Sequence, residues 1–334
     1  KYLFGMDTRQ FLPEILILEH FLNHRCRLRM DIHKNDSFSN ATLAFVIPVP
    51  WTLQMSLRNK TLTNIVFKLV STLILQSVTF QSFPQNHILL YTSTHPSKSM
   101  WSPSIFPALS DRRIIALHLE GPRGDTRHGA YQSGRRTVVV PYFTESGFSI
   151  DSAINRTLSS EEQNISGAFV MLKCNNKGGH WRNLLVRYFR NLKGSHVVMH
   201  KRKYFSSSSY ESTVREYLLT ILHYRKSTFC LIPPGLTASS RRLYESVQSG
   251  CIPVLVSDHF LLPFYDGEVR VLWDNAVVRH SQSNMSTLPG LLYSMPKWQI
   301  RKLKRAGQRL KKDIAYVEGQ TLLRIHNAIN QLLY

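Results

Sequence analysis

The chain has 334 residues, 43% of them hydrophobic, so it is long enough for two domains that each bury a core. Its formal net charge of +21 excludes a charge-balanced surface. It predicts an anionic binding partner: a nucleotide diphosphate, an acidic polysaccharide, nucleic acid or a membrane surface. The four cysteines lack paired C-x-x-C spacing, which argues against a zinc site.

Helices and strands alternate in the first 150 residues. The expected elements are a helix over 13–23, a strand over 41–49, a helix over 62–80, and strands over 87–91, 114–119 and 137–140. Lys68 and several polar residues interrupt the 62–80 segment, so it is predicted to be amphipathic and not to cross a membrane. Strands that alternate with helices indicate a parallel sheet.

A polar stretch over 144–166 is expected to link this part to a second set of elements. The second set is a strand over 168–172, a helix over 181–192, a strand over 195–200, a helix over 210–224, a longer unit over 229–266, and a basic helix over 296–316. The predicted organisation is an N-terminal domain over 1–150, a second domain over 165–295, and C-terminal basic helices over 296–334 that pack on both.

The unit over 229–266 reads as strand, turn, helix and strand. A short apolar strand stops at Pro233-Pro234-Gly235, which neither a strand nor a helix crosses without losing backbone hydrogen bonds. Ser239 and Ser240 are N-cap candidates for a helix over 241–249, and Gly250 ends that helix in a left-handed conformation. The apolar run over 251–256 is typical of a buried parallel strand.

The start of the 241–249 helix favours an anion. Free amide groups and the positive end of the helix dipole meet there, and Arg241 and Arg242 add cations where only a negative partner makes them favourable. Guanidinium groups grip a diphosphate bidentately. Glu245 lies one turn deeper on the Arg241 face, where a carboxylate can accept hydrogen bonds from ribose hydroxyls. An ordinary salt-bridged helix with a capped start remains the alternative explanation.

These residues resemble the C-terminal signature of the exostosin family of glycosyltransferases, in the segments PPG, SSRRLYES, SGCIPV, SD and LPF. The resemblance implies an α/β GT-B fold, with two Rossmann-like domains facing a central cleft. It also implies a UDP-sugar donor substrate held mainly by the C-terminal domain, and inverting transfer to a polysaccharide or glycan hydroxyl without an Asp-x-Asp metal motif or another cofactor.

Fainter similarities to the family extend over 42–50, 86–90, 137–142 and 179–185, and the last of these places Arg182 at a helix start. Two departures stand out. Leu236 replaces the Asp that usually follows PPG, and Leu172-Lys173-Cys174 stands where many members carry Phe-Arg-Gly, which keeps a cation but loses a glycine. A degenerate or specialised member is therefore one alternative.

Inverting transfer needs charge stabilisation on the departing diphosphate and a base for the acceptor hydroxyl. Arg241, Arg242 and Arg182, with the amides after Ser239, are the candidates for the first role. The base is expected on a loop after an N-terminal strand, which leaves His95, Glu120 and His118 open. The loop over 121–136 is either part of the acceptor site or a mobile surface loop. Asp258, after the strand over 251–256, is a second-rank donor-site candidate.

The helix over 296–316 carries much of the positive charge. Its apolar stripe at three-to-four spacing is expected to face the core, and its cations a solvated surface, with contact to an acidic glycan or anionic lipid as the sharper alternative. The stripe consists of Leu303, Ala306, Leu310 and Ile314.

Glycosylation sequons point to the secretory pathway. They are more frequent than chance predicts and lie at Asn35, Asn40, Asn59, Asn155, Asn164 and Asn284. Cys230 and Cys251 begin neighbouring predicted strands and suit either a disulfide or two small buried thiols. The family resemblance implies the Golgi lumen and a type II membrane anchor in a segment outside these residues.

Two other classes of function stay open. One is a noncatalytic exostosin-like protein that binds a glycan or a partner transferase in a transferase complex. The other is a basic nucleic-acid-binding protein, although the sequence shows no helix-turn-helix, RRM or zinc pattern and we expect no nucleic-acid partner.

Overall fold

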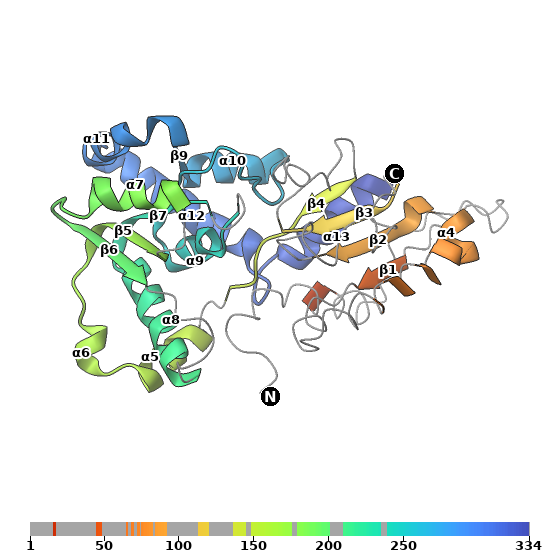
Figure 1. Ribbon diagram of the computed structural model, residues 1–334, viewed down its shortest axis with the longest axis horizontal. Helices are drawn as coiled ribbons and strands as arrows, with labels where there is room; N and C mark the ends of the chain where they lie inside the picture. Colours follow the sequence, from red (N-terminus) through yellow and green to blue (C-terminus); the bar gives the residue numbers. More distant parts are fainter. Residues whose placement is uncertain are drawn as a thin grey trace. The chain divides into compact units, whose positions relative to one another are not determined.

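The computed structural model describes residues 16–17, 45–48, 65, 68–69, 72–73, 75–82, 84–91, 113–119, 136–144, 148–175, 179–200, 210–234 and 239–333 (Figure 1). The chain forms two compact units. Unit 1 comprises Lys1–Gln10, Tyr142–Phe260 and Tyr265–Gln320, and unit 2 comprises Phe11–Pro141, Leu261–Phe264 and Thr321–Tyr334. Each unit contains its own parallel sheet, so the predicted α/β class with parallel sheets is confirmed.

Unit 2 contains a four-stranded sheet in chain order. Its strands are β1 (Phe45–Pro48), β2 (His87–Tyr91), β3 (Ile115–His118) and β4 (Thr137–Val139). Short helices α4 (Val78–Ser82) and η3 (Pro84–Asn86) precede β2, and the C-terminal helix α13 (Thr321–Leu333) packs against β4. Every side chain of β3 is buried, as expected where helices cover both faces of a parallel sheet. The four strands predicted here are confirmed.

Unit 1 contains a five-stranded sheet in the order β6-β5-β7-β8-β9. The strands are β5 (Ala168–Asn175), β6 (Ser195–His200), β7 (Ser227–Ile232), β8 (Ile252–Leu255) and β9 (Val278–Arg279). The chain passes from β5 to β6 on one side and then to β7 on the other. The strand order therefore reverses between β5 and β7, which is the position where open α/β sheets bind ligands beyond the strands' carboxyl ends.

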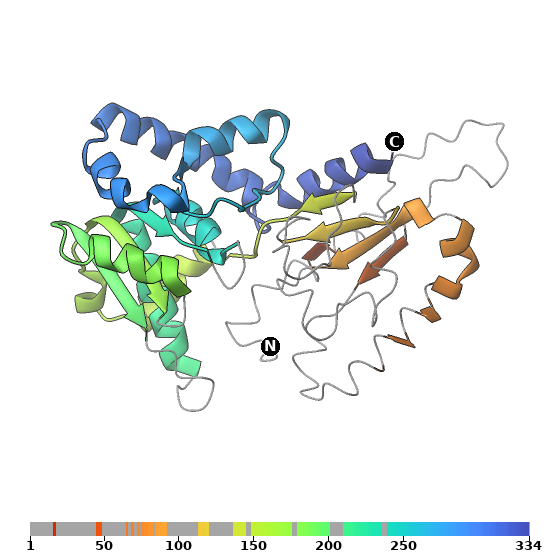
Figure 2. The ribbon, with the colours of Figure 1, turned by 45° about the horizontal axis from the view of Figure 1, so that its top comes forward.

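Helices cover both faces of this sheet (Figures 1 and 2). On one face, α8 (Tyr210–Arg225) packs against α9 (Arg241–Ser249). The other face carries α7 (Gly179–Phe189), η6 (Gln282–Thr287) and α11 (Leu288–Tyr293). Strand β8 is followed along the chain by α10 (Gly267–Ala276), which packs against α12 (Lys297–Ile314).

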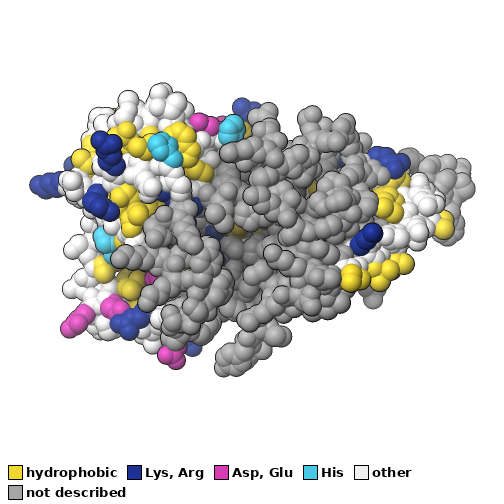
Figure 3. All heavy atoms as spheres, in the orientation of Figure 1, with side chains coloured by type: hydrophobic (Ala, Val, Ile, Leu, Met, Phe, Trp, Pro, Cys, Tyr) yellow, Lys and Arg dark blue, Asp and Glu magenta, His cyan; other side chains and the backbone are white. Residues whose placement is uncertain are grey.

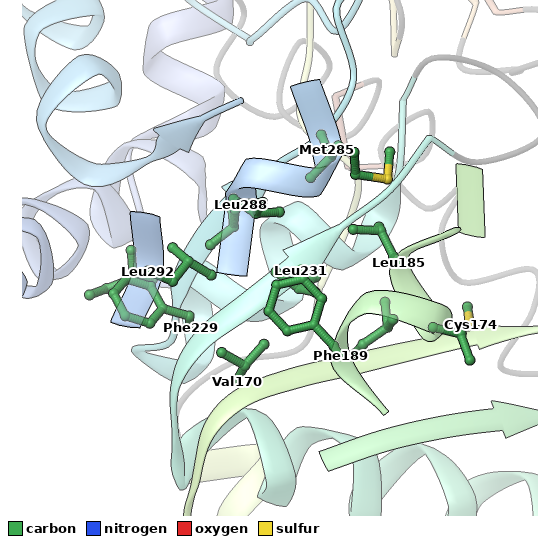
Figure 4. Packing of buried hydrophobic residues seen from close by; sticks show 14 of the residues in the cluster. Val170, Cys174, Leu185, Phe189, Phe229, Leu231, Met285, Leu288 and Leu292 are labelled. Atoms are coloured by element: carbon green, nitrogen blue, oxygen red, sulfur yellow. The ribbon is translucent and has the colours of Figure 1, made fainter. Parts of the chain in front are cut away.

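The core of unit 1 lies between the α7 face of the sheet and the helices above it. Val170 and Leu172 on β5, with Phe229 and Leu231 on β7, pack against Leu185 of α7 (Figure 4). Burying a Val, Leu or Phe side chain stabilises a fold by about 1.5–3 kcal/mol. Alternation along β5 sends Val170 and Leu172 into this core and turns Lys173 to the α8 face.

The prediction of a linker over 144–166 is wrong, because this segment contains α5 (Phe148–Thr157) and α6 (Ser160–Gln163). Ile150, Ile154 and Leu158 are buried at helical spacing, so this segment has an apolar face of its own. Ser159 and Glu162 form a reciprocal capping box at the start of α6.

The helix over 296–316 is confirmed as α12. Leu303, Leu310 and Ile314 of its predicted stripe are buried, whereas Ala306 is only half-buried. Among the described residues, no helix combines the length and the apolar character that crossing a bilayer requires.

Candidate functional site

The carboxyl ends of β5 and β7 and the start of α9 come together in unit 1. Helix α9 has the predicted bounds, and Gly250 ends it with φ 78°, as expected. A disulfide joins Cys230 of β7 to Cys251 before β8, which settles the choice that the sequence left open. The disulfide thus spans the stretch of chain that contains α9.

The two serines before α9 lie where an N-cap is expected. Ser240 is the N-cap residue, with φ −155° and ψ 128°, and makes no side-chain capping bond. The buried Ser239 hydroxyl instead lies 2.8 Å from the Tyr142 hydroxyl. The Tyr142 ring also contacts the Tyr244 ring, at 5.6 Å between centroids. The sequence did not predict the contacts that Tyr142 makes with Ser239 and Tyr244.

Arg241 and Glu245 form an ion pair on one face of α9. The Arg241 Nε lies 2.7 Å from Glu245 Oε1, and the Glu245 side chain is only 5% exposed. The Arg241 guanidinium also lies 5.6 Å from the centre of the Tyr217 ring. The carboxylate therefore holds the guanidinium at the helix start, and a buried carboxylate without this partner would be costly.

The charge of Arg242 acts on two groups of β5. It lowers the pKa values of the Lys173 ammonium and the Cys174 thiol, each as a smaller effect beside burial. Helix α9 has no acidic residue in its first turn to offset these cations. The result is an excess of positive charge at the amino end of α9, beside the reversal in strand order.

Lys173 is a partly buried cation at the carboxyl end of β5. Burial lowers its pKa, while the Glu216 carboxylate, 3.3 Å away, opposes that effect. Its ammonium also donates to the Thr220 hydroxyl, which itself donates to the Glu216 carbonyl. A lysine interrupting an apolar strand was the signal for this network, but the α8 partners could not be assigned from the sequence.

Arg182 on α7 binds the turn that follows β7. Its Nε and Nη2 atoms donate to the Pro234 carbonyl at 3.1 and 3.0 Å, and its side chain is 5% exposed. This fork joins the element after β5 to the loop after β7. Arg182 therefore holds Pro234, which follows β7, in place.

Asp258, after β8, contacts the start of η6. Its carboxylate accepts from the Gln282 amide at 3.1 Å and from the Ser281 hydroxyl at 3.5 Å. The Asp258 amide donates to Gln282 Oε1 at 3.4 Å. These bonds join the β8 loop to η6, on a different strand end from the Arg241 pair.

Several candidates fall outside this cluster. His95, Glu120, Leu236 and the loop over 121–135 lie outside the described residues. His118 is described, and it is buried within β3 of unit 2. Across the described ranges, no group of three or more His, Cys, Asp or Glu is placed to hold a metal ion.

Comparison with known proteins decides the family. The sequence profile of the Exostosin GT47 domain matches residues 6–295. This chain belongs to the exostosin GT47 family. The confirmed resemblance centred on the α9 signature, and the profile match extends it over most of the chain.

Curated relatives in this family match over shorter segments. The chain is 32% identical to an exostosin-1 homolog of Caenorhabditis elegans over 84 residues, which are 25% of this chain and 21% of that protein. It is 36% identical to exostosin-1 of Drosophila melanogaster over 86 residues, 26% of this chain and 11% of that one. A "probable glucuronosyltransferase" of Oryza sativa subsp. japonica is 39% identical over 72 residues, 22% of this chain and 16% of that protein. The chain thus spans about a fifth or less of these exostosin relatives.

Two solved structures show weaker similarity. A GtfA/B complex has a TM-score of 0.38 and 8% sequence identity, over 77% of this chain and 55% of that one. The pneumococcal O-GlcNAc transferase GtfA in complex with UDP and GlcNAc has a TM-score of 0.35 and 12% identity, over the same shares. The assignment to the exostosin family rests on the sequence profile.

Proposed function

We propose that this exostosin-family chain is an inverting glycosyltransferase that moves a sugar from a UDP-sugar to a hydroxyl of a polysaccharide or glycan. The observation that supports this most is the start of α9, where Arg241 and Arg242 meet the positive end of the helix beside the reversal in strand order. A diphosphate is the anion whose size and charge suit two adjacent guanidinium groups.

In this proposal the arginines act on the leaving group. Arg241, braced by Glu245, and Arg242 would stabilise the charge that develops on the departing UDP, together with the amides after Ser239. Arg182 would fix the position of the Pro234 carbonyl beyond the end of β7. Glu245 would have to share its carboxylate between Arg241 and the ribose hydroxyls. Asp258 remains a second-rank candidate for donor contact.

No step of this mechanism requires a bound cofactor, since the arginines and the helix start would supply the positive charge. The general base stays a proposal with two candidates, His95 and Glu120. The proposed partners are the nucleotide-sugar donor and a glycan acceptor. A membrane anchor and a transferase complex are further expectations from the family.

We also propose the Golgi lumen as the location. The Cys230–Cys251 disulfide favours an oxidising compartment. The asparagines of the three described sequons, Asn155, Asn164 and Asn284, are all exposed, as acceptors of N-glycans must be.

The test is a thermal-shift panel of UDP, GDP and UDP-sugars on the full chain, followed by product analysis. UDP should raise the melting temperature, because a ligand that binds only the folded state stabilises it by about 2.7 kcal/mol at 100 times its Kd. Arg241→Ala should lose this shift and reduce kcat/KM by about 100-fold or more. Arg187→Ala, which removes an exposed arginine of α7, is the matched control.

The double variant Arg241→Ala/Glu245→Gln separates folding from function, because it leaves no buried carboxylate unpaired. It should melt close to the unmodified chain and still fail to bind UDP. Unchanged turnover in Arg241→Ala would contradict the role proposed for this residue.

A noncatalytic glycan- or partner-binding protein is the second candidate. It is favoured by Lys173, the cation that stands in place of the family's usual arginine, because its ammonium is committed to Glu216 and Thr220 on α8. The departures at Leu236 and Cys174 point the same way. Retained UDP binding without product from any UDP-sugar would distinguish this candidate from a transferase.

A further inference from the structure

Helix α12 carries an outward face that is almost wholly cationic. Its sequence KWQIRKLKRAGQRLKKDI contains a single acidic residue, Asp313, which is buried. The cations are Lys297, Arg301, Lys302, Lys304, Arg305, Arg309, Lys311 and Lys312. All except the half-buried Lys311 are exposed. Figure 2 shows α12 beside α10, its main packing partner.

The charges on this face repel one another. Lys297, Arg301, Arg305 and Arg309 follow at intervals of four residues, so each cation lies one turn from the next, and like charges at this spacing destabilise a helix. Among the residues that the structure describes, no side chain of an acidic residue pairs with any cation of α12. A cation in the first turn also opposes the helix dipole. An external polyanion would relieve this repulsion.

The face is long and narrow. From Lys297 to Lys312 it extends about 22 Å at 1.5 Å per residue. On the face drawn in Figure 3, the visible Lys and Arg side chains are interspersed with other side chains and do not gather into one patch. A line of cations of this length suits an extended polymer with regularly spaced negative charges better than a single small anion.

Trp298 adds an apolar element at the start of the helix. Its side chain is 62% exposed, although a ring of this size usually buries most of its surface. An exposed indole offers a flat apolar surface on which the apolar face of a pyranose ring can pack. Cations beside an exposed aromatic ring therefore match the chemistry of a charged carbohydrate.

A lipid bilayer fits this face less well. Interfacial helices bury their apolar side in the membrane, but Leu303, Leu310 and Ile314 of α12 are buried inside unit 1. The anionic leaflet of cellular membranes faces the cytoplasm, whereas the Cys230–Cys251 disulfide favours an oxidising compartment. The same compartment argument disfavours nucleic acid.

From these observations we propose that the exposed face of α12 is a binding surface for a linear acidic glycan, separate from the α9 site. Carboxylate or sulfate groups along the glycan would contact the row at Lys297, Arg301, Arg305 and Lys312, and Trp298 would pack on a sugar ring. This binding needs neither a nucleotide-sugar nor turnover, so it does not depend on the proposed transferase activity.

The test measures binding of the full chain to a fluorescent oligogalacturonate, with an uncharged dextran oligosaccharide of equal length as the neutral probe. The triple variant Arg301→Gln/Arg305→Gln/Lys312→Gln should weaken oligogalacturonate binding by at least about tenfold. The matched control is Arg187→Gln/Arg190→Gln/Lys193→Gln, which removes three exposed cations from α7 and the turn after it. It should change the affinity by less than about twofold.

Two further variants test whether charge and the Trp298 ring cause the binding. Arg301→Lys/Arg305→Lys retains every charge and should keep most of the affinity, whether or not the glutamine variant folds well. Trp298→Ala should weaken binding to the oligogalacturonate without changing its dependence on salt. The proposal is overturned if both glutamine triples weaken binding equally, or if dextran binds as tightly as the polyuronate. It is also overturned if α12-dependent binding is stronger to single-stranded RNA or to phosphatidylserine vesicles.

Discussion

The His223 side chain is a residue-scale example of a group whose ionisation is set by its neighbours. Burial, the stacked His196 ring and the Lys173 ammonium lower the pKa of His223 from 6.5 to about 4. The ring centroids of His196 and His223 lie 4.2 Å apart. A proton on His223 would therefore lose part of its hydration and lie near the Lys173 cation, so the folded state disfavours the charged imidazole.

Stability should consequently depend on pH through His223. Between pH 6.5 and about 4 the unfolded chain binds a proton that the folded chain excludes, so the free energy of unfolding decreases as the pH falls through this window. His223→Phe keeps a flat ring against His196 and removes the titration. Its denaturation midpoint, relative to the unmodified chain, should rise on going from about pH 7 to about pH 4.5.

The control for this prediction is His259→Gln, which replaces an exposed histidine after β8. Its midpoint should follow that of the unmodified chain at both pH values. If His223→Phe also follows the unmodified chain at both, His223 does not titrate as its surroundings imply.

The sequence predicted some residues of the site but not their hydrogen-bond partners. The ion pair of Arg241 with Glu245 was the alternative to a ribose contact that their spacing of four on one helix offered, and the left-handed Gly250 followed from its place after the last helical residue. The Ser239 hydroxyl went to Tyr142, which lies 97 positions earlier in the chain. Hydroxyl partners set by tertiary contact leave no local pattern in a sequence.

At the scale of elements, the cross-link between β7 and β8 surrounds the turn and helix of the candidate site. Cys230 and Cys251 are separated by 21 residues, and the loop between them contains α9. A cross-link over a loop of this length removes freedom mainly from the unfolded chain. The disulfide should therefore stabilise the α9 segment without contacting any ligand.

Cys230→Ala/Cys251→Ala should accordingly lower the free energy of unfolding by about 3 kcal/mol in a urea titration. Cys174→Ala is the control, since it removes a buried thiol that is not cross-linked. The same loss should appear in the unmodified chain when a reducing agent is present. Equal stability with and without the reductant would show that the cross-link contributes little.

The elements themselves were predictable where periodicity was strong. Strands over 87–91 and 195–200 and the helix over 241–249 have the predicted bounds, because apolar runs and a terminal glycine mark them. The 144–166 segment was misassigned because its polar composition and sequons outweighed two local signals: the spacing of Ile150, Ile154 and Leu158, and the Ser159–Glu162 capping box. Composition is a weaker guide than periodicity in such a segment.

At the scale of the whole molecule, the sequons and the disulfide both support the proposed location in the secretory pathway. Asn155 lies in the last turn of α5, Asn164 directly follows α6, and Asn284 lies in η6. All three side chains are exposed. A chain folded in the secretory pathway should carry glycans at these positions, because their side chains are accessible.

Chain produced in the secretory pathway of eukaryotic cells should therefore migrate faster after treatment with peptide N-glycosidase. Replacing Asn155, Asn164 and Asn284 by Gln should remove a corresponding part of that shift, and Asn275→Gln, at a half-buried asparagine outside any sequon, should remove none. An unchanged mobility after enzyme treatment would argue against the proposed Golgi location.

The buried thiol of Cys174 bears on how the correct disulfide is kept. Burial raises its pKa, and its Sγ lies 3.4 Å from Met199 Sδ inside the sheet of unit 1. Thiol exchange requires an accessible thiolate, so Cys174 cannot attack the Cys230–Cys251 bond while β5 is in place. Exchange between Cys174 and the Cys230–Cys251 bond is therefore confined to chains that have lost this sheet, and the yield of the Cys230–Cys251 bond in oxidative refolding should depend on how early β5 joins β7.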